Sequence, residues 1–220
     1  MKIGAILLAG GTGSRMGSSI PKQFWLLQGK PVALYSLEVL ISLTQVVEIV
    51  VVCSLEYRSL FSNYPVRFAL PGEQRQDSVY NGLCQVSDAI QWVAVHDAAR
   101  PFITPSMVQN LFDQGKDVGA ASLAMPAKNT LKEVQSGNQV SCTLNRSQIW
   151  EVQTPQLLKK EILEAGFAHA HTHKTLVTDD VSLAELMGHP VQLVQGSYQN
   201  IKITTPEDWA FAEWYTTNSG

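Results

Sequence analysis

Apolar runs suited to buried strands alternate along the chain with segments whose apolar residues recur at helical spacing. The predicted strands cover residues 3–9, 46–53, 66–70, 91–95 and 118–125. Helical patterns begin at Pro31, near Leu55, after Gly72 and at Pro105, and they can lay apolar faces on a sheet. This alternation predicts an α/β fold with a doubly wound, mainly parallel sheet.

The pattern changes after Pro126. Residues 127–148 alternate loosely around the turn Ser136-Gly137-Asn138, a hairpin signal, with too little apolar content for a core. A two-stranded ribbon alone is marginal in water, so we expect a projecting β-arm that packs on a partner and makes a homodimer. The chain then returns through residues 150–156 to a helix ending near Ala168. It closes with helices over 181–187 and 206–215 and short strands over 191–194 and 200–203.

Length and composition narrow the class of protein. The 220 residues suit one domain, 1–220, and the 16 basic and 19 acidic residues include no basic cluster of the kind that binds nucleic acid. No apolar stretch is long enough to span a membrane. The cysteines Cys53, Cys84 and Cys142 lack the spacing of a disulfide framework or zinc site, so we expect a cytoplasmic protein.

A glycine-rich loop follows the first predicted strand and carries the clearest chemistry. Gly10, Gly11 and Gly13 lie within four residues, and the cations Arg15 and Lys22 come next. Glycine lets backbone N–H groups turn onto an anion at close range. The segment therefore predicts a phosphate-binding loop.

Two common phosphate loops are excluded by single residues. The dinucleotide fingerprint needs glycine where Met16 stands, and no acidic residue follows at the spacing of a ribose contact, which disfavours a nicotinamide oxidoreductase. No segment matches the Walker A pattern. The observed pattern, L-A-x-G-x-G-x-R-M-x-x-x-x-P-K, resembles that of nucleotidyltransferases that join a nucleoside triphosphate to a sugar phosphate.

Other candidate residues are more ambiguous alone. Asp97 follows a predicted central strand, where ligands of open α/β sheets bind, and a carboxylate near a triphosphate favours a Mg²⁺ or ribose contact. Arg75 opposes the dipole of its helix, which a nearby anion or simple solvation can explain. Ser78 can bond its own backbone or face a ligand. Lys202 alternates onto the opposite face from its apolar neighbours, and an exposed strand lysine is the alternative.

Two further clusters have simple structural interpretations. His169, His171 and His173 lack an acidic or cysteine ligand nearby and are predicted to be a solvated helix end. Asp179 and Asp180 precede a predicted helix and fit an N-terminal cap with acids that favour the helix dipole.

The order of several motifs resembles that of the 2-C-methyl-D-erythritol 4-phosphate cytidylyltransferase family, nearly from end to end. The matching segments are residues 8–22, 75–79, 96–101, 128–130, 146, 150–156, 178–180 and 200–202. The resemblance implies a Rossmann-like domain whose β-arm interlocks two subunits. It implies cytidylyl transfer from CTP to methylerythritol 4-phosphate, with Mg²⁺ or another divalent cation as cofactor and pyrophosphate as second product.

The resemblance also implies three groups of site residues. The CTP phosphates would lie on the loop with its two cations, that is on Ala9, Gly10, Gly11, Gly13, Arg15 and Lys22. The cytosine, the ribose and the metal would be held by Gly72, Glu73, Ser78 and Asp97. The acceptor would lie near Arg100, Thr154 and Lys202, with Thr130 and Arg146 reaching in from the partner's arm.

Some positions depart from the family pattern. Ala9-Gly10-Gly11 is closer to the related ribitol-5-phosphate cytidylyltransferases, which remain an alternative, although residues 96–101 and 150–156 favour the methylerythritol family. Asn129 and Asn145 stand where the arm usually carries acids. A non-catalytic CTP-binding sensor is the hypothesis from another functional class, since a fold does not fix function.

Overall fold

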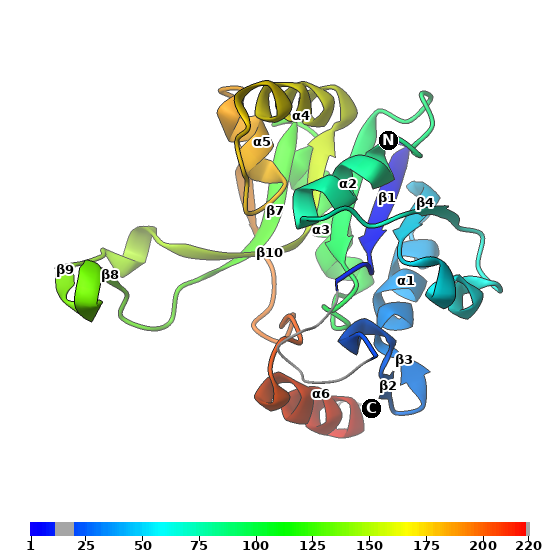
Figure 1. Ribbon diagram of the computed structural model, residues 1–220, viewed down its shortest axis with the longest axis horizontal. Helices are drawn as coiled ribbons and strands as arrows, with labels where there is room; N and C mark the ends of the chain where they lie inside the picture. The colour runs from blue at the N-terminus through cyan, green and yellow to red at the C-terminus, as the bar shows by residue number, and fades with distance from the viewer. Residues whose placement is uncertain (12–19, 219–220) are drawn as a thin grey trace.

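A seven-stranded sheet forms the centre of the computed structural model, which describes residues 1–11 and 20–218 (Figure 1). The strand order is β11-β7-β10-β6-β1-β4-β5. Neighbouring strands are parallel except at β10, which runs antiparallel to both β6 and β7. The strands are β1 (Ile3–Leu8), β4 (Val46–Val52), β5 (Arg67–Ala69), β6 (Trp92–Asp97), β7 (Ala120–Pro126), β10 (Trp150–Lys159) and β11 (Gln192–Gln195). The predicted α/β class with a mainly parallel sheet is confirmed.

Helices cover both faces of this sheet, because alternate strand residues are apolar on each side. One face packs against α1 (Val32–Ser42) and α3 (Pro105–Gly115). The other packs against α2 (Arg75–Leu83), α4 (Lys160–His173) and α5 (Val181–Leu186). Within the described parts of the chain, no helix is long and apolar enough to cross a bilayer.

The C-terminal helix α6 (Pro206–Asn218) packs beside the main sheet rather than on it. It contributes Ala212 to a small buried cluster with Leu27, Val32 and Ile203. Leu27 comes from a short ribbon of β2 (Leu26–Leu27) and β3 (Lys30–Pro31). The 3-10 turns in residues 1–11 and 20–218 are η2 (Lys22–Phe24), η3 (Leu55–Phe61), η4 (Ser136–Asn138) and η5 (Arg146–Gln148).

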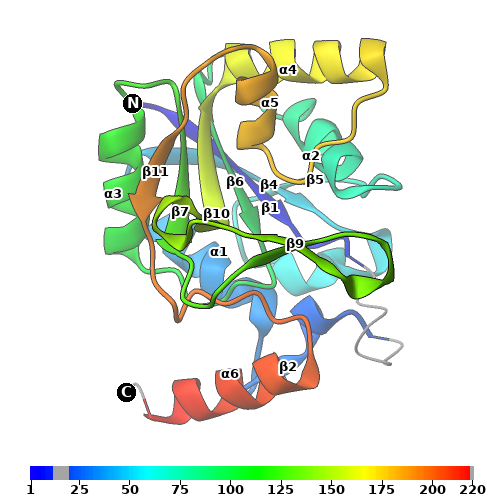
Figure 2. The ribbon, with the colours of Figure 1, turned by 90° about the vertical axis from the view of Figure 1, so that its left-hand side faces the viewer.

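The predicted hairpin is present and projects from the body. Its strands are β8 (Lys132–Val134) and β9 (Val140–Thr143), and both are exposed along their whole length. Figure 1 shows the arm extending to one side, and Figure 2 shows it crossing in front of the sheet. Its use in dimerisation stays a prediction.

Three predictions of local structure were wrong or incomplete. Residues 150–156, taken as a return segment, begin the ten-residue strand β10, whose polar residues obscured its central position. Helix α4 continues beyond Ala168 to His173, so the three histidines occupy its last turns. Residues 200–203 are not a strand, although the N–H of Ile203 donates to the carbonyl of Ala99 at 2.9 Å.

The sheet has a topological switch point between β1 and β6. From β1 the chain continues to β4 and β5 on one side, then crosses back to β6 on the other side. Leu8 pairs with Asp97 across these parallel strands, so both strands end at the same edge. Ligands of open α/β sheets bind outside the carboxyl ends of the strands at such a point.

Candidate active site

A cavity of about 430 Å³ opens at the carboxyl end of β6. It is lined by residues from five separate segments of the chain, which are Arg75, Asp97, Arg100, Val152, Gln153, Thr154, Gln156, Thr178, Asp179, Ser182, Glu185 and Lys202. Four predicted site residues, Asp97, Arg100, Thr154 and Lys202, meet in it. A cavity of similar size at the amino end of β6, lined by residues such as Asp88 and Lys160, contains none of them.

Asp97 is the buried anion at the centre of this pocket. Its Oδ2 lies 2.8 Å from Nζ of Lys202, and its Oδ1 lies 3.2 Å from Nε of Arg75. Burial alone would raise the pKa of the Asp97 carboxyl, but Arg75 and Lys202 outweigh it and hold that pKa well below its ordinary value. Asp97 is therefore ionised. Lys202, predicted to lie on the opposite face from its apolar neighbours, points into the site.

Arg75 joins Asp97 to a second buried carboxylate. Its Nη1 and Nη2 donate to the two oxygens of Asp180 at 2.9 and 2.8 Å. The nearby anion that the sequence suggested for Arg75 is thus present, and two carboxylates, Asp97 and Asp180, supply it. Asp180 occupies the predicted N-cap position of α5, but its side chain makes no capping hydrogen bond. Asp179 accepts the hydrogen bond from the N–H of Ser182 at 3.2 Å instead. In the sequence, the signals for the contact between Arg75 and Asp180 were a cation in the first turn of a helix and two adjacent acids.

Arg100 brings a further cation to the pocket. Its Nη1 donates to the carbonyl of Asn200 at 2.8 Å, while its Nε has no hydrogen-bond partner among the residues that the structure describes. Burial lowers the pKa of Arg100, and Asp97 offsets only part of that effect. A partly buried guanidinium with spare donors is suited to a phosphate or carboxylate ligand.

Thr154 lines the pocket, but its hydroxyl bonds inward. Its Oγ1 accepts from the backbone N–H of Asp97 at 3.1 Å and lies 3.0 Å from Nδ1 of His96. The substrate contact of Thr154 stays a prediction.

The described part of the glycine-rich loop is fixed from two sides. The Gln23 side chain, which the sequence analysis did not single out, donates to the carbonyls of Ala9 and Gly11 at 2.7 and 2.8 Å. A Cβ on Gly10 would lie 2.5 Å from Cβ of Pro71, so only glycine permits this approach. The predicted loop residues Gly13 and Arg15 lie outside the described residues.

The loop before α2 therefore adjoins the glycine-rich loop. Ser78 Oγ accepts from the N–H of Gly72 at 3.0 Å and donates to the carbonyl of Gln74 at 3.1 Å. A Cβ on Gly72 would lie 2.3 Å from Cβ of Asp77, which explains the glycine. Ser78 thus bonds local backbone, one of its two predicted options, and Glu73 is exposed beside it.

The remaining predicted residues lie elsewhere. Lys22 is buried and begins η2. Thr130 and Arg146 are exposed near the base of the arm and do not line the pocket of their own chain. Arg146 Nη1 donates to the carbonyl of Lys128 at 2.7 Å.

Comparison with known proteins identifies the family. Residues 3–218 match the family model described as IspD, 2-C-methyl-D-erythritol 4-phosphate cytidylyltransferase. The chain belongs to this family. The assignment confirms the predicted cytidylyltransferase class and does not favour the ribitol 5-phosphate alternative.

Individual relatives align with almost the whole of this chain. The Chlamydia pneumoniae protein named 2-C-methyl-D-erythritol 4-phosphate cytidylyltransferase is 46% identical over 213 residues, which is 97% of this chain and 98% of the relative. The chloroplastic protein of that name from Oryza sativa subsp. japonica is 44% identical over 217 residues, 96% of this chain and 73% of the relative.

Solved structures of the family share the fold. The Francisella tularensis 2-C-methyl-D-erythritol 4-phosphate cytidylyltransferase is 34% identical with a TM-score of 0.85, covering 97% of this chain and 99% of that one. The 4-diphosphocytidyl-2C-methyl-D-erythritol synthase of Anaerococcus prevotii has a TM-score of 0.88 at 27% identity, covering 99% of each chain. This chain therefore has the fold of its family.

Proposed function

We propose that the pocket at the end of β6 transfers the cytidylyl group of CTP to 2-C-methyl-D-erythritol 4-phosphate, in the non-mevalonate route to isoprenoids. The observation that carries this proposal is the meeting of Arg75, Arg100 and Lys202 around one ionised carboxylate, at the sheet edge where β1 ends and the glycine-rich loop begins. Two phosphorylated substrates need concentrated positive charge and backbone N–H groups in one place.

The reaction needs charge stabilisation more than proton transfer. An oxygen of the acceptor phosphate attacks the α-phosphorus of CTP, a new P–O bond forms, and the bond to the β-phosphate oxygen breaks to release pyrophosphate. A phosphate monoester is already anionic at neutral pH, so no general base is required. We assign charge stabilisation to Arg15, Lys22 and Lys202, with Arg100 on the acceptor phosphate.

The CTP contacts are proposed on the two adjoining loops. The phosphates would lie against Ala9, Gly10, Gly11 and Gly13, and the cytosine against Gly72 and the backbone of Glu73. The contact between Gly10 and Pro71 supports this division, because it puts the loops side by side. Ser78 would act by holding the Gly72 turn open toward the base.

A divalent cation, Mg²⁺ in our proposal, would be held by Asp97 together with nucleotide phosphates. Mg²⁺ commonly uses one or two carboxylates plus substrate oxygens, so a single carboxylate fits. No cluster of three or more potential protein ligands is present in residues 1–11 and 20–218. Bound there, the ion would neutralise phosphate charge during transfer. Asp97 would exchange an ion pair with Lys202 or Arg75 for the metal.

We also propose that 1–220 forms one domain and that the arm, about 127–148, makes a homodimer. Val134 and Val140 are each 56% exposed on the arm strands, and Leu144 is exposed beside them, which suits a partner surface. Thr130 and Arg146 would then reach the acceptor site of the partner. The exposed positions of both residues near the arm base support a contact outside their own chain.

Pyrophosphate release tests the function directly. Purified protein with CTP and Mg²⁺ is given methylerythritol 4-phosphate or ribitol 5-phosphate in parallel. We expect release with the first acceptor only. Release with ribitol 5-phosphate alone would overturn the acceptor assignment, and CTP binding without release from either would indicate a sensor.

A further inference from the structure

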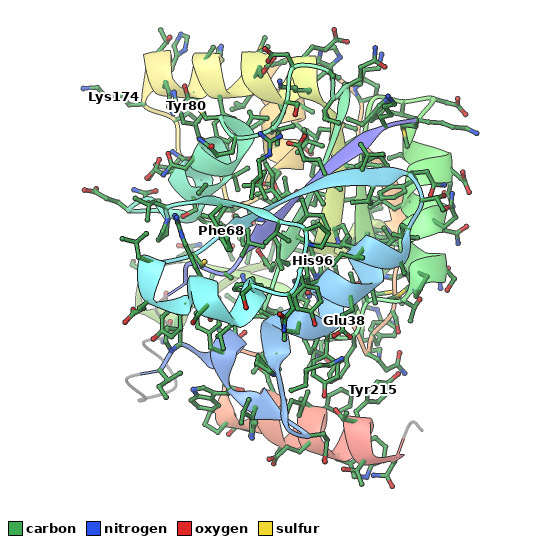
Figure 3. All side chains as sticks on the ribbon, turned by 90° about the vertical axis from the view of Figure 1, so that its right-hand side faces the viewer. Glu38, Phe68, Tyr80, His96, Lys174 and Tyr215 are labelled. Carbon is green, nitrogen blue, oxygen red and sulfur yellow. The ribbon has the colours of Figure 1, made fainter. Side chains whose placement is uncertain are left out.

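His96 has no exposed surface and lies in the interior of the molecule (Figure 3). It is the residue before Asp97 on β6. Its Nε2 lies 3.1 Å from the carbonyl oxygen of Arg100, and its Nδ1 lies 3.0 Å from Oγ1 of Thr154. A buried imidazole with both nitrogens engaged holds two partners in fixed positions.

The direction of each hydrogen bond follows from the partners. A carbonyl oxygen can only accept, so Nε2 carries the hydrogen, and in a neutral ring Nδ1 must then accept. The Thr154 hydroxyl therefore donates to Nδ1. Its oxygen in turn accepts from the N–H of Asp97 at 3.1 Å. Burial, which lowers the pKa of His96 to about 4, agrees with a neutral ring.

A second set of hydrogen bonds closes these contacts into a ring. Arg100 Nη1 donates to the carbonyl of Asn200 at 2.8 Å, and Asn200 Nδ2 donates to the carbonyl of Thr154 at 3.0 Å. Asn200 is fully buried and begins the short segment that ends in Lys202. The ring thus joins β6, β10 and the segment that carries Lys202, and with them Asp97 and Arg100.

We propose that His96 is a positioning residue for cytidylyl transfer, and that the Thr154 hydroxyl serves His96 and Asp97 rather than the acceptor. The hydrogen of Thr154 is committed to Nδ1, which leaves none for a phosphate oxygen. The ring sets the backbone from which the Asp97 and Arg100 side chains enter the pocket. This inference rests on the proposed function for its kinetic consequence only.

Variants that keep or remove single hydrogen bonds test the ring. Thr154→Val keeps the shape of the side chain but removes the hydroxyl, whereas Thr154→Ser keeps the hydroxyl. His96→Gln can keep the hydrogen-bond donor to the Arg100 carbonyl but loses the acceptor that Nδ1 provides. Thr172→Val is the matched control, because Thr172 lies on the exposed side of α4 and its hydroxyl bonds the carbonyl of Ala168 in the same helix. Pyrophosphate release gives kcat and KM for both substrates, and thermal unfolding reports folding.

We expect Thr154→Val and His96→Gln each to lower kcat by about 10-fold to 100-fold with little change in KM for the acceptor, as a small misplacement of reacting groups does. Thr154→Ser should stay close to wild type. The double variant should lose no more than the worse single variant, because each single variant already removes the hydrogen bond between Thr154 and Nδ1 of His96. A raised acceptor KM in Thr154→Val, with unchanged kcat in His96→Gln, would show that Thr154 binds substrate directly and overturn the proposal.

Nitrogen-15 NMR of the histidine rings gives a readout independent of activity. In the wild-type protein at neutral pH, His96 should carry its hydrogen on Nε2, and its Nδ1 signal should move in Thr154→Val but not in Thr172→Val. A hydrogen on Nδ1 would overturn the ring whatever the kinetics, and it needs no variant that folds. Absence of pyrophosphate release in the wild type, with the expected tautomer, would contradict the proposed function instead.

Discussion

Arg75, at the start of α2, donates from both terminal nitrogens to the buried carboxylate of Asp180, at 2.9 and 2.8 Å. The same guanidinium donates from Nε to Asp97 at 3.2 Å. Arg75 thereby ties the helix before β6 to the start of α5 and to the central carboxylate of the site. A planar, always charged fork is required, since lysine cannot meet two carboxylates in this way.

Breaking this buried pair should destabilise the fold. Asp180→Ala leaves part of the Arg75 charge uncompensated, and we expect the free energy of unfolding to fall by about 3 kcal/mol. Urea denaturation measures it. Arg67→Ala is the control, because Arg67 pairs with Glu48 at a far more exposed position, and a loss below about 1 kcal/mol is expected there. Equal losses in both variants would contradict a special role for Arg75.

Lys22 should matter for chemistry rather than for binding alone. Lys22→Ala removes a cation from the end of the glycine-rich loop, and we expect kcat to fall about 100-fold or more, as after loss of one transition-state donor. Lys116→Ala, at the end of α3, is the control. Initial rates of pyrophosphate release at saturating CTP measure both. An unimpaired Lys22→Ala enzyme would remove Lys22 from the mechanism.

Stability should depend on pH through His96. Burial lowers its pKa from 6.5 to about 4, so between these values the unfolded chain binds a proton that the folded chain does not. The free energy of unfolding therefore rises with pH across this window, by about 3 kcal/mol in all, and falls as the solution is acidified. Denaturation at several pH values in EDTA checks this. His96→Gln should show a shallower slope, and an unchanged slope would disprove the attribution.

The proposed metal can be tested by removal. We expect EDTA to abolish pyrophosphate release and added Mg²⁺ to restore it. The reason is that the CTP phosphates, the acceptor phosphate and the Asp97 carboxylate, all anionic, must approach one another. Asp97→Asn should need a higher Mg²⁺ concentration for half-maximal rate. Full activity in EDTA would show that the cationic side chains suffice.

A shared site predicts rescue between inactive chains. Arg146→Ala and Lys202→Ala should each be nearly inactive, because they disable the arm contact and the pocket respectively. In a co-expressed mixture, half of the dimers contain one intact site, so about a quarter of wild-type activity should return if the dimer is symmetric. Size-exclusion chromatography with light scattering confirms the dimer. A mixture no more active than its components would place the whole site in one chain.

The sequence alone was sufficient for the features that are local. Apolar runs predicted β1, β4, β6 and β7, because a strand buried by helices on both faces must be apolar throughout. The glycine-rich loop and the place of Asp97 at a strand end also follow from short stretches of residues. The hairpin was visible from its turn and its lack of apolar content.

Only the tertiary structure determined which distant residues meet. Strand β10 escaped prediction because Gln153, Thr154 and Gln156 are polar, and they are tolerated inside only because partners elsewhere accept or donate their hydrogen bonds. Asp180 was predicted to cap α5 and does hold the N-cap position, but its side chain bonds Arg75 from a distant helix instead of the α5 backbone. Short patterns report burial and turns, whereas ion pairs and buried hydrogen bonds depend on how segments far apart in the chain pack together.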